Sequence, residues 1–345
     1  MFAKHVPRVP LGKNGPLVPR LGLGTMGLTK PTYGTIPNED EIFAFFDRAY
    51  EAGATFWDSA DYYDNCEEII GKWFKRTGKR NDIVLATKFG YVKNSPTFEL
   101  NTTYEYVKKA CTESLRLLDI EFIDLYYLHT PNPETPIEET MRALKELQDE
   151  GKIKHIGLSA VTSTTLRRAA KIAPVAAVQI GYSAFELYAE GDKGTHIIDT
   201  CRELGVAVVA AMPLGRGLLT TDFISATAAN QANDVRFKLI PRFIGENLEK
   251  NIKLVSQFKE LADKKGTTTA QLAIAWLLKQ GDDIIPIPGT KKIKYFEENW
   301  AALDIVLRDE EEAEIRRFVE NAEIAGLPLP DAMVGWLFRD TKKES

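Results

Sequence analysis

Eight short apolar runs, each followed by a stretch with helical spacing, constrain most strongly how this chain can fold. They lie between residue 21 and about residue 300. In order, the runs are "RLGLGT", "TFWD", "DIVLATK", "FIDLYYLH", "IKHIGLS", "AAVQIGYS", "VAVVAAMPLG" and "DIIPIPG". A chain in which strands and helices alternate in this way favours a parallel sheet covered by its helices.

The stretches between these runs have the sequence signals of helices. In "EDEIFAFFDRAYEAG", the apolar residues Ile42, Phe45, Phe46 and Ala49 recur at helical spacing, and Gly53 follows as a stop. "PIEETMRALKELQDEG" opens with a proline and closes with a glycine, which are common at helix starts and stops.

Eight strand–helix repeats without a long linker predict an α/β fold, namely a closed (β/α)8 TIM barrel, with residues 1–345 as a single domain. An open doubly wound sheet is the competing fold. It is disfavoured because no GxGxxG motif opens any of the helices, and the nearest candidate, "GLGTMG", has the wrong spacing.

The two ends of the chain extend beyond the repeats. Residues 7–18 predict a β-hairpin that turns at "KNG" and covers the bottom of the barrel. The barrel itself is expected over about residues 20–305. A tail over about residues 322–345 is rich in proline and irregular, and we expect it to form a loop over the barrel mouth. Its apolar side chains, which need a surface to cover, are Leu327, Leu329, Met333, Trp336 and Phe338.

Charge and composition exclude several functions. A formal net charge of −5 without a long basic block argues against a nucleic-acid partner. No run reaches the roughly 18 apolar residues of a membrane span, and no secretory signal is visible. Cys66, Cys111 and Cys201 lie far apart, which predicts reduced thiols, and the four histidines lack metal-ligand spacing. We expect a cytoplasmic monomer or homo-oligomer with no metal and no membrane partner.

Polar residues end several of the apolar runs. They are Asp58, Lys88, His129, Ser159, Gln179 and the segment Pro213–Arg216. In a TIM barrel the carboxyl ends of the strands form the mouth, where active sites lie. Each of these polar residues, taken alone, has an ordinary structural explanation. Asp58 could cap a turn, Lys88 could pair with a surface carboxylate, and His129 could be hydrogen-bonded in the core. Their joint occurrence favours an active site.

The same segments, in the same order, resemble the aldo-keto reductase family nearly end to end. The family's Asp-Thr-Ala-x-x-Tyr motif corresponds to "DSADYY", in which Ser59 replaces threonine and the tyrosine is Tyr63. "ATKFG" contains Lys88 and "LYYLHTP" contains His129. "IGLSA", "VQIGYS", "MPLGRGLL" and "IPIPGTKKIKYFEEN" resemble the segments that bind the cofactor. The chain is most similar to the microbial and plant branch that includes pyridoxal reductases.

The resemblance implies reduction of an aldehyde or ketone to an alcohol by hydride transfer. Such a reaction needs an acid that protonates the carbonyl oxygen and donors that stabilise its negative charge. Tyr63 would be the general acid, with Lys88 and Asp58 as the pair that tunes it. We expect the ammonium group of Lys88 to lower the pKa of Tyr63. His129 would polarise the carbonyl or relay its proton.

NADPH/NADP+ is the cofactor that the resemblance implies. The residues expected to contact it are Gly24, Thr25, Met26, Ser159, Gln179, Met212, Pro213, Leu214, Gly215, Arg216, Gly217, Gly289, Thr290, Lys292, Glu298 and Asn299. Ser159 and Gln179 would bind the nicotinamide carboxamide. Backbone groups of residues 214–217, with the side chain of Arg216, would bind the pyrophosphate.

The adenosine end would lie at "GTKKIKYFEEN". Thr290 and Lys292 would meet the 2′-phosphate, and Glu298 and Asn299 the adenine. The alternative for the lysines at residues 291–294 is a solvated helix start. A cationic helix N-terminus favours a phosphate, because its free N–H groups add to the charge.

The segments that resemble the cofactor-binding ones depart from the family pattern at three places. Ala211 and Met212 precede Pro213 where an aromatic residue usually stacks on the nicotinamide. Ala160 stands where Asn or Glu usually follows the serine, and Tyr295 aligns with a frequent arginine. Either Met212 packs on the nicotinamide or that face of it is more open.

The expected substrate pocket combines Met26, Trp57, Phe89, His129 and Trp336. Aromatic walls favour a small apolar or ring-bearing carbonyl compound. Pyridoxal is a candidate by resemblance, and a tailoring ketone of secondary metabolism is another.

Two other functions remain open. Some aldo-keto-reductase-like proteins are channel β-subunits that bind NADPH and sense redox state with little turnover. A barrel aldolase could instead use Lys88 as a Schiff-base nucleophile, but such a lysine must lose its proton, which the neighbouring Asp58 opposes.

Overall fold

The computed structural model describes residues 6–93, 95, 97–225 and 234–344. In these residues a parallel sheet has the strand order β10-β9-β8-β7-β6-β5-β4-β3, so that each strand lies beside its predecessor in the sequence. The strands are β3 (Leu23–Gly24), β4 (Phe56–Asp58), β5 (Val84–Phe89), β6 (Ile123–Leu128), β7 (Ile153–Ser159), β8 (Val175–Gly181), β9 (Ala207–Ala211) and β10 (Ile284–Pro286). Each corresponds to one of the eight apolar runs, with β5 and β8 extending one residue beyond theirs, to Phe89 and Val175.

The sheet closes on itself between its first and last strands. The backbone N–H of Gly22 donates to the carbonyl of Pro286 (2.9 Å), and that of Gly24 donates to the carbonyl of Pro288 (3.2 Å). Gly24 also forms a parallel bridge with Gly289. A Cβ atom on Gly289 would lie 2.9 Å from the carbonyl oxygen of Gly24, so glycine permits this approach. The predicted TIM barrel is confirmed.

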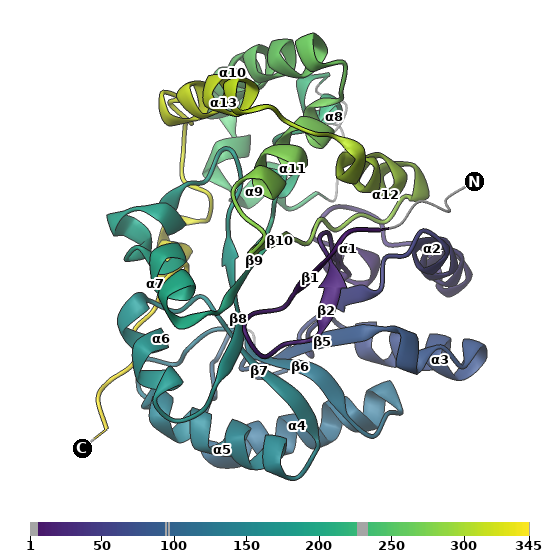
Figure 1. Cartoon of the computed structure of the whole chain (residues 1–345), viewed down its shortest axis with the longest axis vertical. Helices are drawn as coiled ribbons and strands as arrows, with labels where there is room; N and C mark the ends of the chain where they lie inside the picture. Colours follow the sequence, from purple (N-terminus) through teal and green to yellow (C-terminus); the bar gives the residue numbers. More distant parts are fainter. Residues whose placement is uncertain (1–5, 94, 96, 226–233, 345) are drawn as a thin grey trace.

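Helices surround the strands (Figure 1). The longer ones are α2 (Glu39–Glu51), α3 (Cys66–Thr77), α4 (Tyr104–Leu118), α5 (Ile137–Asp149), α6 (Ser163–Ala170), α7 (Ile197–Leu204), α10 (Gly245–Lys265), α11 (Thr269–Lys279), α12 (Ile293–Trp300) and α13 (Asp309–Glu320). Single-turn helices are α1 (Met26–Thr29), α8 (Thr221–Ile224) and α9 (Arg236–Leu239). The 3-10 helices are η1 (Arg80–Asp82), η2 (Tyr188–Glu190), η3 (Asp192–Gly194), η4 (Gly215–Gly217), η6 (Pro241–Phe243), η7 (Ala301–Asp304) and η8 (Asp331–Trp336).

Helix α2 shows how local sequence sets these elements. The side chain of Asn38 accepts a hydrogen bond from the backbone N–H of Glu41, and the Glu41 carboxylate accepts one from the backbone N–H of Asn38. This reciprocal cap satisfies two N–H groups that have no partner within the helix. The buried face of α2 holds the four apolar residues whose spacing predicted it.

Side chains alternate along the strands and form two cores. Residues that point into the barrel, such as Phe56, Leu125, Tyr127 and Val209, make an inner core. Their neighbours pack outward against the helices in a larger outer core.

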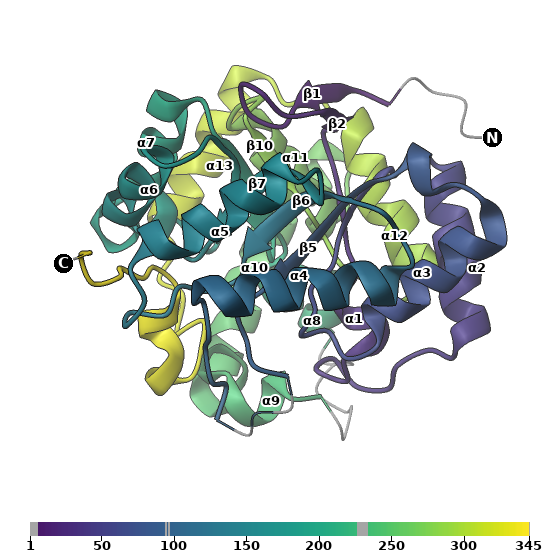
Figure 2. The same cartoon turned by 90° about the horizontal axis from the view of Figure 1, so that it is seen from below.

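Different elements lie at the two ends of the barrel (Figure 2). The predicted hairpin, β1 (Arg8–Pro10) and β2 (Leu17–Pro19), pairs Val9 with Val18 and joins the inner core. Leu11 and Val18 are fully buried there, and each such burial stabilises the fold by about 1.5–3 kcal/mol. Helices α8 and α9 lie at the opposite end.

The C-terminal tail lies at the barrel mouth, as predicted. The backbone N–H of Arg339 donates to the carbonyl of Ala160 (2.8 Å), and that of Thr162 donates to the carbonyl of Arg339 (3.2 Å). Thr341 Oγ1 accepts a hydrogen bond from the N–H of Ile137 (3.1 Å). These contacts fix the tail beside the ends of β6 and β7. Among the described residues, no helix has the length and apolar character needed to cross a membrane.

Candidate active site

The alternation of side chains decides which strand-end residues reach the barrel mouth. Asp58 and Lys88 point into the barrel, so the residues beside them, Trp57 and Phe89, point outward. The ring of Trp57 stacks on Phe46 with centroids 4.5 Å apart, and Phe89 packs on Tyr126 at 4.9 Å. Both are fully buried in the outer core. The structure therefore places Trp57 and Phe89 outside the expected substrate pocket.

A buried ion pair lies at the base of the mouth. The ammonium of Lys88 donates to Asp58 Oδ1 and to the carbonyl oxygen of Ser59 (2.7 Å), and Gln179 Nε2 donates to Asp58 Oδ2 (2.7 Å). Lys88 is 0% and Asp58 2% exposed. Removing one partner of such a pair leaves an uncompensated buried charge and costs about 3–5 kcal/mol. The pair is thus held in one geometry before any ligand binds.

Tyr63 and His129 lie above this pair and are both partly exposed. Lys88 Nζ is 5.1 Å from the centroid of the Tyr63 ring. The rings of Tyr63 and His129 meet edge to face, with centroids 5.8 Å apart. The carbonyl of Tyr63 accepts hydrogen bonds from Thr29 Oγ1 (2.8 Å) and from the N–H of Cys66 (3.0 Å), which fix the loop before α3. The four residues expected from the sequence are therefore neighbours.

The pKa of Tyr63 differs from the expectation. Burial, with a contribution from the Asp58 carboxylate, raises the pKa of Tyr63 well above its usual range. The ammonium of Lys88 is paired with Asp58 and does not offset these effects, so the pKa of Tyr63 is raised where the sequence predicted that it would be lowered. Burial, together with the charges of Lys88 and Lys30, lowers the pKa of His129 well below its usual range. At neutral pH the phenol is protonated and the imidazole is neutral.

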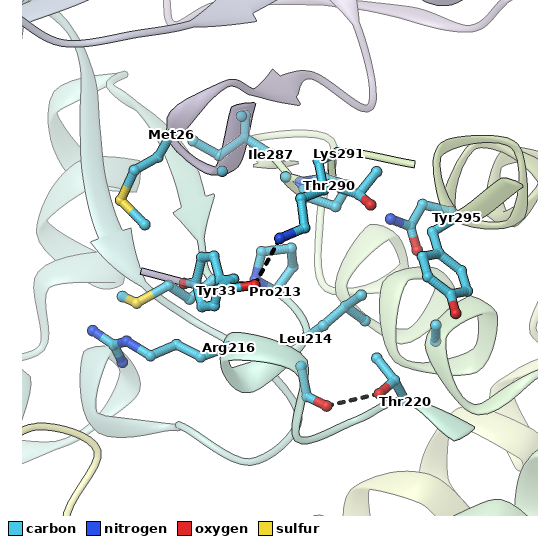
Figure 3. A pocket seen from close by; sticks show the side chains of 18 of the residues that line it. Met26, Tyr33, Pro213, Leu214, Arg216, Thr220, Ile287, Thr290, Lys291 and Tyr295 are labelled. Atoms are coloured by element: carbon cyan, nitrogen blue, oxygen red, sulfur yellow. Dashed lines mark hydrogen bonds between the residues drawn. The ribbon is translucent and has the colours of Figure 1, made fainter. Parts of the chain in front are cut away.

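A cavity of about 690 Å³ leads from Asp58 and Tyr63 along β9 and β10 to the start of α12 (Figure 3). Of the residues expected to contact a cofactor, those that line it are Gly24, Thr25, Met26, Gln179, Met212, Pro213, Leu214, Arg216, Gly217, Gly289, Thr290, Lys292, Glu298 and Asn299. Ser159 and Gly215 are not part of its wall. Ser159 lies beside Gln179 in the β7–β8 ladder. Ala211 and Met212, which stand where the family pattern has an aromatic residue, both line the cavity.

The loop after β9 bends sharply around one side of the cavity. Met212 and Arg216 have positive φ angles of 53° and 59°, and Gly217 has one of 89°. Arg216 Nη1 donates to the carbonyl of Pro328 (3.1 Å), so its guanidinium is bound to the C-terminal tail. Figure 3 shows this side chain beside the cavity, with Leu214 and Pro213 forming the wall.

Tyr33 and Arg236 are wall residues that the sequence did not indicate. Arg236 Nη1 donates to the carbonyl of Arg216 (2.6 Å), and its guanidinium lies 5.2 Å from the centroid of the Tyr33 ring. Tyr33 also forms a bridge with Asp234. These contacts join the loop after β3 to the loop after β9 across the cavity. No periodic pattern marks either loop in the sequence.

The lysines at the start of α12 have different environments. Lys291 Nζ donates to the carbonyls of Tyr33 (2.7 Å) and Thr35 (2.6 Å), so it holds the loop after β3 (Figure 3). Lys292 and Lys294 are exposed and line the cavity. The hydroxyl of Tyr295 donates to Asp222 Oδ2 (2.5 Å), which links α12 to α8.

Aromatic side chains surround the mouth on the side of His129. The Tyr91 ring meets the His129 ring at 4.9 Å and the Trp336 ring at 6.3 Å, and Trp336 also contacts Phe98 at 6.1 Å. Trp336 thus lies at the mouth as expected, and Met26 lines the cavity. Tyr91, which the sequence did not single out, lies two residues beyond Phe89.

Comparison with known proteins identifies the family. The Aldo/keto reductase family matches residues 20–320. The chain is 47% identical over 318 residues to aldo-keto reductase str7 of Strobilurus tenacellus, covering 90% of this chain and 91% of that one. It is 46% identical over 328 residues to the NADP(+) aldo-keto reductase yakc of Schizosaccharomyces pombe, covering 94% and 95%. The chain belongs to the aldo/keto reductase family.

Solved structures agree with this assignment. The glycerol dehydrogenase AKR11B4 from Gluconobacter oxydans superposes with a TM-score of 0.80 at 26% identity, covering 94% of this chain and 98% of that one. The thermostable aldo-keto reductase Tm1743, in complex with the inhibitor epalrestat, superposes with a TM-score of 0.72 at 27% identity, covering 90% and 99%. The family predicted from the sequence is confirmed.

Proposed function

We propose that this protein reduces an aldehyde or ketone to an alcohol with NADPH. The observation that supports it most is the partly exposed pair of Tyr63 and His129 above the buried Lys88–Asp58 pair, at one end of the long cavity. In the overall reaction, one carbonyl, one NADPH and one proton give one alcohol and one NADP+.

The cavity fits this cofactor in size and in chemistry. Its volume of about 690 Å³ lies within the range of cofactor sites, roughly 300–1,000 Å³. One end has exposed cations, Lys292 and Lys294, at the N-terminus of α12, a place that favours a phosphate. The other end reaches Tyr63. When bound, NADPH supplies the hydride.

Each segment of the wall has a proposed task. Gln179 in the wall and Ser159, which lies beside it in the β7–β8 ladder, bind the carboxamide of the nicotinamide. Gln179 would then divide its amide between the cofactor and Asp58. The backbone of residues 214–217 binds the pyrophosphate. Thr290 and Lys292 bind the 2′-phosphate. The adenine contacts are Glu298 and Asn299.

Tyr63 is the proposed proton donor. Because its pKa is raised, the phenol keeps its proton until negative charge develops on the carbonyl oxygen, which is then a far stronger base. The charge left on the phenol oxygen faces Lys88, whose position is fixed by Asp58 and by the carbonyl of Ser59. Neutral His129 orients the carbonyl oxygen beside the phenol by a hydrogen bond.

The rim supports a ring-bearing substrate. Tyr91, Phe98 and Trp336 present aromatic faces beside His129, against which a planar compound can stack. Pyridoxal and other aromatic carbonyl compounds fit this description.

The test is a panel of aldehydes and ketones followed by the loss of NADPH absorbance, with Tyr63→Phe as the matched variant. Wild type should oxidise NADPH with aromatic aldehydes, and the variant should be slower by about 10² or more, the usual contribution of an acid catalyst. Fluorescence titration should show unchanged NADPH binding in Tyr63→Phe. Equal rates in the two proteins would remove Tyr63 from the mechanism, and NADPH binding without oxidation across the panel would contradict the enzyme function.

A further inference from the structure

Two neighbouring side chains at the end of α1 bind the backbone carbonyls of Tyr62 and Tyr63. Thr29 Oγ1 donates to the carbonyl of Tyr63 (2.8 Å). Lys30 Nζ donates to the carbonyl of Tyr62 (2.8 Å). Thr29 is 3% exposed, so its hydrogen bond is shielded from water. We call these two hydrogen bonds the α1 clamp.

Lys30 contacts three groups of the loop that it holds. Besides donating to the carbonyl of Tyr62, its Nζ lies 3.6 Å from the centroid of the Tyr62 ring and 3.6 Å from Asp64 Oδ1. Its backbone N–H donates to the carbonyl of Met26 (3.0 Å), which closes the turn of α1 from which the side chain extends. A lysine side chain is flexible, but these contacts fix the direction of this one.

The segment that carries the clamp is itself anchored to the end of β4. Thr25 donates to the carbonyl of Asp58 from its backbone N–H (3.0 Å) and from Oγ1 (2.9 Å). Thr25 and Met26 line the cavity, and Figure 3 shows Met26 in its wall. Neither Thr29 nor Lys30 is among the described residues that line it. The clamp thus acts on the loop of Tyr63 from behind the cavity wall.

The phenol of Tyr63 depends on its backbone for its place. Its ring meets His129 edge to face, with centroids 5.8 Å apart, and its centroid lies 5.1 Å from Lys88 Nζ. Within the described part of the chain its hydroxyl forms no hydrogen bond, so the ring contacts and the backbone position the phenol. A misplacement of about 1 Å between reacting groups can lower a rate by about 10²-fold. The hold on this backbone therefore matters for proton transfer.

We propose that Thr29 and Lys30 are positioning residues for carbonyl reduction: they hold the backbone of Tyr62 and Tyr63 so that the phenol stays directed at the substrate oxygen. This role rests on the proposed function, in which Tyr63 is the proton donor, and adds two residues that act through it. Both residues then act on kcat rather than on the affinity for substrate or cofactor.

Thr29→Val tests the first contact, because it removes the hydroxyl at nearly constant shape. The carbonyl of Tyr63 keeps the N–H of Cys66 as a donor (3.0 Å), so the variant should unfold in urea with a midpoint close to that of the wild type. With benzaldehyde, kcat should fall about 10-fold, while KM and the Kd of NADPH should change by no more than about twofold. The matched control is Thr29→Ser, which keeps the hydroxyl and should recover most of the lost kcat.

The same change in a Tyr63→Phe background separates positioning from a general structural role. Without the phenol hydroxyl there is no proton donor to direct, so Thr29→Val should lower the remaining rate by no more than about twofold. A 10-fold fall in both backgrounds would overturn the role of Thr29, as would an unchanged kcat in Thr29→Val when Tyr63→Phe is slow. If Tyr63→Phe is as fast as the wild type, the proposed proton donor itself is wrong, and no positioning role remains.

Lys30→Met tests the second contact, with Asp64→Asn as the matched control. Lys30→Met removes the ammonium at similar length, and kcat should fall about 5-fold. Asp64→Asn removes the ion-pair partner of Lys30 but leaves its hydrogen bond to Tyr62, and asparagine tolerates the positive φ of 49° at this position. Its kcat should stay within about twofold of the wild type.

The rates of Lys30→Met and Asp64→Asn are compared at about pH 8, where His129 is neutral in each protein. This choice removes the contribution of Lys30 to the low pKa of His129. A kcat for Lys30→Met equal to that of the wild type would overturn the role of Lys30. An equal fall in the two variants would also overturn it, since the ion pair and not the hydrogen bond to Tyr62 would then be responsible.

Discussion

At one end of the cavity, Asp58, Lys88 and Gln179 come from the ends of regular strands; at the other, Thr290 and Lys292 come from a loop and a helix start. The strand-end group is buried and its hydrogen bonds are complete without a ligand. In the second group, the exposed side chain of Lys292 has no such network among the described residues. The first end is preorganised for chemistry, whereas the second depends on a ligand to order its side chains.

The largest expected effect comes from breaking the preorganised end. Lys88→Met leaves the Asp58 carboxylate buried without a counterion, so we expect a loss of about 3–5 kcal/mol in the free energy of unfolding. Carbonyl reduction should fall by about 10²–10³, because the developing charge loses its fixed counterion. Urea unfolding and NADPH oxidation measure the two effects.

The double variant Asp58→Asn/Lys88→Met is the control for the buried charge. Without the carboxylate, part of the lost stability should return while activity stays low. If Lys88→Met is as stable as the wild type, the ion pair does not hold this end of the cavity together.

The same contrast explains what the sequence could predict. Strand ends repeat in a regular order, so Asp58, Lys88 and His129 could be placed at one mouth from the sequence alone. The alternation along each strand also explains why Trp57 and Phe89 were wrongly expected in the substrate pocket. Trp57 precedes the inward-pointing Asp58 and Phe89 follows the inward-pointing Lys88, so both side chains point outward. Tyr33, Arg236 and Tyr91 lie outside the strands, where no period relates sequence position to direction. The pKa of Tyr63 depends on burial and on a paired charge, which composition does not show.

A smaller effect tests the second end. Lys292→Ala should weaken NADPH binding by roughly 10- to 100-fold, because one charge-assisted contact to the 2′-phosphate is lost. NADH lacks that phosphate, so its affinity should change by no more than about twofold. Fluorescence titration with both cofactors measures the ratio. An equal loss for NADPH and NADH would show that Lys292 does not contact the 2′-phosphate.

Lys291 offers a matched comparison with its neighbour. It holds the loop after β3 through the carbonyls of Tyr33 and Thr35, so Lys291→Ala should loosen that loop over either cofactor. We expect the dissociation rates of NADPH and NADH to rise by a similar factor, about 5-fold for a net hydrogen-bond loss near 1 kcal/mol. Stopped-flow release measures both rates. A loss confined to NADPH would mean that Lys291 acts on the phosphate instead of the loop.

The smallest effect concerns the protonation of His129. Burial holds its pKa in the folded state below the usual 6.5, so the unfolded chain binds the proton more readily. Its contribution to stability is therefore complete above pH 6.5 and is lost as the pH falls from 6.5 toward the folded pKa. His129→Gln cannot be protonated, so its urea midpoint should fall less steeply between pH 6.5 and 5 than that of the wild type. Burial also lowers the pKa of His155. His155 is present in both proteins, so its effect on the urea midpoint cancels when the two proteins are compared. Parallel midpoint curves would show that His129 takes up its proton as easily in the folded protein as in the unfolded chain.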